Sequence, residues 1–246
     1  MTSVIDNLQD VHSRIATACS EAGRPVHAVT LLAVSKTQSA RAVAEAQAAG
    51  QRDFGENYVQ EALDKIAALA ALVDTRAHPV WHLIGPLQSN KTRAVAEHFD
   101  WVHSVDRLKI AQRLSEQRPP GLAPLQVCLQ VNISGEASKS GLAPDEVAGV
   151  AHAVAALPRL RLRGLMAIPE PTEDVAAQRR PYRALRVLLD QLNGAGLGLD
   201  TLSIGMSADL EAAIAEGATL VRVGTAIFGE RSGRLGDVGR SGGIAG

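Results

Sequence analysis

The chain has 246 residues, a net charge of -1 at neutral pH and 46% hydrophobic residues, which predicts a soluble globular protein. This charge argues against nucleic acid as the main partner, because phosphate backbones select basic surfaces. No apolar run approaches the roughly 18 residues that a membrane span needs, and the first residues lack the apolar core of a signal peptide. The two cysteines, Cys19 and Cys128, lie far apart without metal-ligand spacing, so we expect a cytoplasmic protein without a disulfide scaffold or zinc site.

Short β-rich runs alternate with longer helical patterns along the chain. A helix is expected at residues 2–22, before the first strand. Strands are expected at residues 27–36, 52–57, 79–85, 101–105, 125–134, 162–169, 201–207 and 218–229. Helices are expected between them, at residues 39–50, 57–73, 87–99, 106–117, 143–157, 173–193 and 207–217. Pro181 is expected to kink or restart the helix that contains it.

Eight strands, each followed by helical sequence, predict a single (β/α)₈ barrel, and about 250 residues is its usual length. An open, doubly wound parallel sheet is the alternative, because alternation alone does not show that the sheet closes. The barrel is expected over residues 1–231. Residues 232–246 are rich in glycine and poor in apolar residues, and we expect them to form a disordered tail.

Lys36 follows directly on the apolar run of the first strand, LLAVS. In a barrel of this kind, the functional residues lie at the carboxyl ends of the strands. A lysine that is desolvated there loses its preference for the charged form, and a neutral amine condenses with aldehydes. The alternative is a rim lysine whose stem packs on apolar surface while its ammonium stays in water.

The last two strands end in residues that suit a phosphate. Ser207 is expected at the end of the seventh strand with a helix directly after it, and Gly224 and Thr225 near the end of the eighth. Barrels often bind phosphate in these two loops, where backbone N–H groups at a helix start favour an anion. Ser207 could instead be a simple helix cap, and Gly224 a packing glycine. A lysine that faces a phosphate site across the closing seam indicates pyridoxal 5′-phosphate (PLP), which is a phosphorylated aldehyde.

Other strand ends supply further candidates for the cofactor face. These are Asn57, His82 and Met166, each of which could equally be an ordinary core or rim residue. The loop after the fifth strand is polar and could be either a mobile lid or a solvated turn. Its candidate residues are Gly135, Glu136, Ser138 and Lys139.

The sequence resembles the PLP homeostasis protein family, whose members are single-domain relatives of the alanine racemase barrel. The resemblance covers residues 5–231 and rests on LLAVSKT, FGENYVQEAL, WHLIGPLQSNK, HSVD, VNISGEASKSGL, GLMAIP and LSIGMSADLEAAIAEGATLVRVGTAIFGER, in the family's order. It implies that Lys36 carries PLP as an internal aldimine and that Ser207, Gly224 and Thr225 hold the phosphate. It also places Arg222 beside the pyridine nitrogen. Because arginine only donates hydrogen bonds, that nitrogen would stay unprotonated and the cofactor would be a weak electron sink.

The resemblance implies a function in PLP homeostasis: buffering, carrying or delivering PLP, with PLP-requiring apoenzymes as candidate acceptors and no substantial catalysis. Two departures from alanine racemases agree with this. Ala40 occupies the position of a phosphate-binding tyrosine, and both tyrosines, Tyr58 and Tyr182, lie in predicted helices instead of a second, β-rich domain. Without that domain we expect a monomer. A slow PLP-dependent racemase or a related PLP enzyme, and a PLP-independent Schiff-base aldolase, remain as alternatives.

Overall fold

The computed structural model describes residues 3–72, 78–136 and 140–229, so the expected tail at 232–246 lies outside the described residues. Eight parallel strands form a closed barrel in chain order. They are β1 (Thr30–Val34), β2 (Asp53–Glu56), β3 (Val80–Leu83), β4 (Trp101–Val105), β5 (Leu125–Gln130), β6 (Leu160–Met166), β7 (Thr201–Ser203) and β8 (Leu220–Val223). The pairing of β8 with β1, with Leu32 opposite Arg222, closes the sheet. The predicted barrel is therefore confirmed and the open sheet is excluded.

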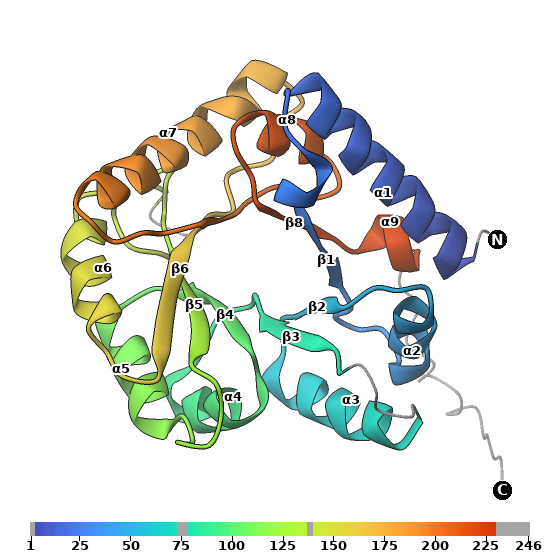
Figure 1. Cartoon of the computed structure of the whole chain (residues 1–246), viewed down its shortest axis with the longest axis horizontal. Coiled ribbons are helices and arrows are strands. Elements are labelled where there is room, and N and C mark those ends of the chain that lie inside the picture. The colour runs from blue at the N-terminus through green and yellow to red at the C-terminus, as the bar shows by residue number, and fades with distance from the viewer. Residues whose placement is uncertain (1–2, 73–77, 137–139, 230–246) are drawn as a thin grey trace, which may run out of the picture.

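Helices surround the barrel in a ring (Figure 1). They are α1 (Val4–Glu21), α2 (Ala40–Ala48), α3 (Val59–Leu72), α4 (Thr92–His98), α5 (Leu108–Gln117), α6 (Val147–Ala155), α7 (Val175–Gly194), α8 (Leu210–Ala215) and α9 (Thr225–Phe228), with 3₁₀ turns η1 (Val26–Ala28) and η2 (Ser89–Lys91). The extra N-terminal helix α1 packs beside α8 and α9, where the amide of Asn7 donates to the carbonyl of Ile227. This helix therefore covers the outside of the seam between β1 and β8.

The local sequence explains why α1 forms where it does. Ser3 and Asp6 form a capping box, in which each side chain accepts a hydrogen bond from the other residue's backbone amide. Buried Leu8, Val11 and Ile15 follow at three- and four-residue spacing, which gives the helix one apolar face. Full burial of each such large side chain contributes roughly 1.5–3 kcal/mol.

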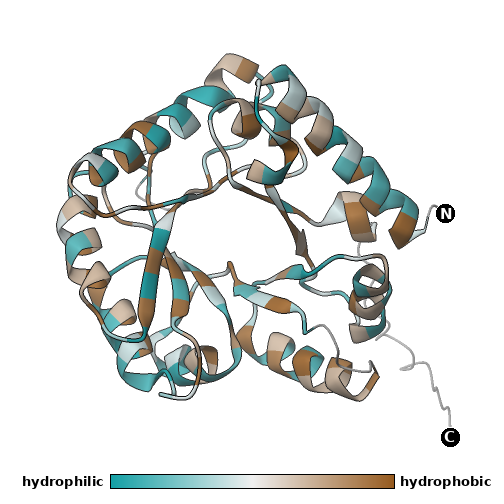
Figure 2. Ribbon diagram, in the orientation of Figure 1, coloured by the Kyte–Doolittle hydropathy of each residue, from teal (hydrophilic) through white to brown (hydrophobic). Residues whose placement is uncertain are grey.

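The other helices are also apolar on one side. Figure 2 shows that their outward faces are largely hydrophilic, while brown, hydrophobic residues gather on the strands and on the inward faces. Pro181 does not restart its helix, because α7 runs unbroken from Val175 to Gly194; a kink at Pro181 stays a prediction. Buried Tyr182, Leu185 and Leu189, which all follow Pro181, hold this part of the helix against the barrel. No helix in the described ranges is long and apolar enough to span a bilayer.

Candidate functional site

A cavity of about 320 Å³ opens at the carboxyl ends of the strands. Its lining consists of Val34, Lys36, Asn57, Ile84, Ile168, Met206, Ser207, Ala208, Arg222, Gly224 and Thr225. Six of the eight candidate residues from the sequence lie in this lining. The other two, His82 and Met166, do not line it. In the described part of the chain, no cluster of His, Cys, Asp or Glu has the makings of a metal site.

Lys36 enters the cavity from the turn that follows β1. Its neighbour Ser35 is fully buried, whereas Lys36 itself is only partly buried. Lys36 is therefore only partly desolvated, because its side chain extends into an open cavity and not into the core. Its amine remains accessible to a ligand that enters the barrel mouth.

Gly224 allows the end of β8 to approach the end of β1 closely. A Cβ atom at this position would lie 3.1 Å from the carbonyl oxygen of Val34 and 3.3 Å from its Cβ. The pairing of Ala33 with Val223 brings the two strand ends into register, so Thr225 stands across the seam from the turn that carries Lys36. The amides of Thr225 and Ala226 lie in the first turn of α9, where no intrahelical acceptor exists. These amides suit an anion such as a phosphate.

Ser207 lies in the loop between β7 and α8, and the expectation that it begins the helix is wrong. The helix begins at Leu210, with Asp209 as its N-cap residue. Asp209 shapes the loop instead: its carboxylate accepts from the backbone amide of Met206 (2.6 Å) and from the hydroxyl of Tyr182 (2.6 Å). The Ser207 hydroxyl is thereby left in the cavity lining, beside Met206.

Arg222 projects from β8 into the floor of the cavity. It is almost fully buried and donates to the carbonyl oxygens of Ser203 (3.0 Å) and Ala167 (2.9 Å). Burial lowers its pKa from the usual value. Within the described residues, no carboxylate forms an ion pair with it. Its guanidinium has five N–H donors, so further donors remain for a ligand acceptor.

His82 belongs to a hydrogen-bonded chain that crosses the barrel interior. Its Nε2 lies 3.0 Å from Asp53 Oδ1, and its Nδ1 lies 2.9 Å from His103 Nε2. His103 Nδ1 lies 2.7 Å from Ser203 Oγ. The same oxygen accepts a hydrogen bond from Arg222 Nη1 at 3.3 Å. Because Asp53 begins β2, the ring of His82 faces away from the carboxyl ends of the strands. The structure therefore places His82 in the barrel interior, outside the cavity lining, and a contact with the cofactor stays a prediction.

Both imidazoles can be neutral in this chain of contacts. A carboxylate only accepts, so His82 donates from Nε2 and its Nδ1 accepts from His103, whose own Nδ1 accepts the Ser203 hydroxyl. Burial, with His82 and Arg222 nearby, holds the pKa of His103 well below its usual range. Met166, the other candidate that lies outside the cavity lining, is fully buried on β6 and pairs with Ser203 across the sheet.

The sequence reasoning missed the apolar part of the lining. Ile84 follows β3, Ile168 follows β6, and Met206 and Ala208 flank Ser207. Their positions just after strand ends could have predicted them, but in the sequence apolar residues at such positions resemble core residues. Ile84 and Ile168 also line a second cavity, of about 260 Å³, formed with the loop after β5. In that loop, Ser138 and Lys139 lie outside the described residues, so the idea of a lid stays a prediction.

Known proteins share both the sequence and this fold. The sequence matches the family model described as alanine racemase, N-terminal domain, over residues 7–232. A pyridoxal phosphate homeostasis protein from Pseudomonas aeruginosa is 65% identical over 232 residues, which cover 94% of this chain and 97% of that protein. The chain belongs to the pyridoxal phosphate homeostasis protein family. The seven motifs predicted this membership correctly.

The structure of a member of this group agrees with the barrel described above. PipY of Synechococcus elongatus PCC7942, solved with PLP bound, is 38% identical and superposes with a TM-score of 0.79, over 92% of this chain and all of that one. Alanine racemase from Clostridium difficile 630 is only 15% identical and has a TM-score of 0.68. This chain matches 56% of the racemase, so the likeness concerns the barrel fold alone.

Proposed function

We propose that this protein binds PLP covalently through Lys36 and serves PLP homeostasis by buffering, carrying or delivering the cofactor. The observation that carries the proposal is the cavity at the β1–β8 seam, whose lining includes Lys36, Gly224 and Thr225. The names of the similar proteins support the same conclusion.

The groups in the cavity fit the two reactive ends of PLP. Condensation of the Lys36 amine with the aldehyde forms a carbon–nitrogen double bond and releases water. The hydroxyls of Ser207 and Thr225, with the backbone amides at Gly224, would hold the phosphate. Arg222 would donate to the pyridine nitrogen, and Asn57 would line the opposite wall.

We propose further that the protein catalyses no substantial turnover. PLP bound here would supply an electron sink, but a donor-only arginine at the ring nitrogen would weaken it. The described lining of the cavity contains no histidine, cysteine, carboxylate or tyrosine that could act beside Lys36 as a general acid or base. Tyr182 offers no substitute, because it is buried and bonded to Asp209, and burial raises its pKa.

We also propose that the protein acts in the cytoplasm as a monomer and passes PLP to PLP-requiring apoenzymes. The cavity is open to solvent on the side of Thr225, which is an exposed residue, so an acceptor could reach it. Sedimentation of the PLP-loaded protein and reactivation of an apoenzyme by it test these two points. Free PLP at the same concentration is the reference for the reactivation.

The absorption spectrum of the purified protein tests the central proposal. We expect a visible band after PLP addition that borohydride removes, with the reduced pyridoxyl group mapped to Lys36. The Lys36→Ala variant should lose this band, whereas Lys109→Ala, which removes an exposed lysine of α5, should keep it. A full band in Lys36→Ala would refute the assignment of the lysine, and no band in the unmodified protein would refute PLP binding.

A further inference from the structure

A buried ion pair lies directly behind the turn that carries Lys36. Lys65 of α3 and Glu56 at the end of β2 approach within 2.6 Å, and their side chains are only 4% and 0% exposed. Taking both charges out of water carries a large desolvation cost, so such a pair stabilises a fold poorly compared with apolar packing. The contacts of this pair with its surroundings indicate what else it does.

The ammonium of Lys65 uses all three of its donors. Besides Glu56, it donates to the backbone carbonyl of Ser35 (2.7 Å) and to the carboxylate of Glu61 (3.1 Å). The hydroxyl of Ser35 donates to the same oxygen of Glu56 at 2.6 Å. The residue before Lys36 is therefore held through both its backbone and its side chain.

The residue after Lys36 is held by the same group of side chains. The backbone amide of Thr37 donates to Glu61 Oε1 (2.5 Å), the oxygen that Lys65 also contacts. Thr37 has φ of 64°, in the left-handed region, which is unfavourable for a residue other than glycine. The bond to Glu61 supports this strained turn.

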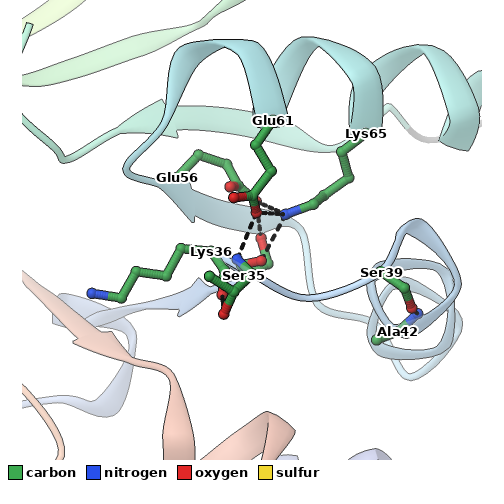
Figure 3. Close-up of polar contacts among 8 residues, drawn as sticks. Ser35, Lys36, Ser39, Ala42, Glu56, Glu61 and Lys65 are labelled. Carbon is green, nitrogen blue, oxygen red and sulfur yellow. Dashed lines mark hydrogen bonds and ion pairs between the residues drawn. The ribbon is translucent and has the colours of Figure 1, made fainter. Parts of the chain in front are cut away.

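Lys36 takes no part in these contacts. Figure 3 shows its side chain extending away from the cluster, while the bonds converge on the backbone on either side of it. The cluster thus holds the peptide units before and after Lys36 and leaves its amine free. This arrangement fixes the direction in which the side chain leaves the backbone.

We propose that Lys65 is a positioning residue for Lys36: through Ser35, Glu56 and Glu61 it holds the turn so that the amine of Lys36 points into the cavity. This inference rests on the proposed function, because it concerns the same lysine. Lys65 is not among the residues that line the cavity. Its effect is on how often the amine stands in reach of an aldehyde, and misplacement by about 1 Å can cost a hundredfold in rate.

The test separates reaction with the amine from binding of the phosphate. The probes are PLP, which can react with Lys36, and pyridoxine 5′-phosphate, which has the same ring and phosphate but no aldehyde. Lys65→Met removes the ammonium but leaves the Glu56 carboxylate buried without its partner, which endangers folding. Lys65→Met/Glu56→Gln removes both charges and keeps the side-chain volumes. Stopped-flow absorbance gives the rate of covalent bond formation, and calorimetry gives the affinity for pyridoxine 5′-phosphate.

We expect the double variant to form the covalent bond on the order of tenfold to a hundredfold more slowly, with an affinity for pyridoxine 5′-phosphate within about twofold of that of the unmodified protein. Arg118→Met is the matched control, because Arg118 is also a buried cation, and it donates to backbone carbonyls of Ala96, Phe99 and Ala123 away from the cavity. This control should lower the melting temperature without slowing the reaction.

Two results would overturn the inference. One is an unchanged rate of covalent bond formation in the double variant. The other is that the double variant and Arg118→Met lose the same amount of reaction rate and the same amount of pyridoxine 5′-phosphate affinity. That result would indicate a general loss of stability. Failure of the proposed function is distinguishable, since the unmodified protein would then form no covalent bond with PLP at all.

Discussion

Thr225 shows how a single exposed hydroxyl can matter for a ligand and not for the fold. It follows Gly224 at the end of β8, is exposed, and lines the cavity that Lys36 enters. The protein places it there through the backbone, because Gly224 lets β8 approach Val34 of β1 closely. Thr225 is therefore a residue whose contribution to binding can be isolated from its contribution to stability.

Thr225→Val removes this hydroxyl with little change of shape. We expect the affinity for PLP to fall about tenfold or somewhat more, because a hydrogen bond to a charged group is worth roughly 1.5–3 kcal/mol. The melting temperature without ligand should stay within about 1 °C. Calorimetric titration with PLP measures the affinity. The control is Thr30→Val, which changes an exposed threonine at the opposite end of β1. Equal affinities of the two variants would contradict a role of Thr225 in phosphate binding.

The sequence was a good guide for residues whose place follows from a strand end. Lys36, Gly224 and Thr225 come after the buried runs of β1 and β8, and closure of the barrel is enough to bring them together. His82 shows where this reasoning fails. It lies within β3, and a strand pattern does not say how deep in the barrel an inward side chain stands. Its contacts with Asp53 and His103 decide that.

At the scale of elements, ion pairs between arginines of α7 and the carboxylate of Glu216 connect α7 to the end of α8. Glu216 is 1% exposed and receives hydrogen bonds from Arg179 (2.7 Å) and Arg183 (2.7 Å), with Arg186 at 3.8 Å. The bond from Arg183 is the main cause of a lowered pKa at Glu216. The three arginines are partly exposed, so solvent screens part of this attraction.

Glu216→Gln should lower the free energy of unfolding by about 1–3 kcal/mol at pH 7. Since the folded pKa is below the unfolded value of about 4.3, the stabilisation is present above that value and is lost as pH falls through the folded pKa. Urea unfolding at pH 7 and at pH 3 measures the free energies of unfolding, and the difference between the two proteins should be smaller at the acidic pH. Glu211→Gln, which breaks an exposed ion pair of α8 with Arg14, is the control and should cost under about 1 kcal/mol.

Element boundaries were less predictable than the elements themselves. Ser207 and Asp209 are both good capping residues, and the sequence does not say which one begins the helix. Asp209 is selected by contacts with Met206 and with Tyr182, and the latter comes from a different helix. The Glu61–Lys65 spacing likewise resembles an ordinary surface pair, although Lys65 is buried against Glu56.

At the scale of the whole molecule, the barrel interior is polar along one line, from Asp53 to Arg222. The groups facing His103 along this line include His82 of β3, Ser203 of β7 and, through Ser203, Arg222 of β8. Because burial holds the pKa of His103 well below its usual range, the folded protein resists protonation there. The unfolded chain protonates this histidine near its ordinary pKa of about 6.5.

The sign of the pH dependence follows from that difference. Stability due to His103 is fully present above about pH 6.5 and falls as the pH drops below it, by up to about 1.4 kcal/mol per pH unit. His103→Gln should be less stable at pH 7 but show a shallower decline between pH 6.5 and 5. Urea unfolding across this range measures it, with His152→Gln, an exposed histidine of α6, as the control. Parallel declines for His103→Gln and the unmodified protein would contradict the prediction.

The seam between β1 and β8 has a consequence for biosynthesis. Lys36 is translated early, and Arg222, Gly224 and Thr225 are translated after the other seven strands. A growing chain therefore carries the reactive amine long before it carries the phosphate site opposite. On this basis, PLP that reaches a growing chain before β8 is made would find no complete cavity. A ligand held from both sides of the seam would bind, and so stabilise, only those molecules whose barrel has closed.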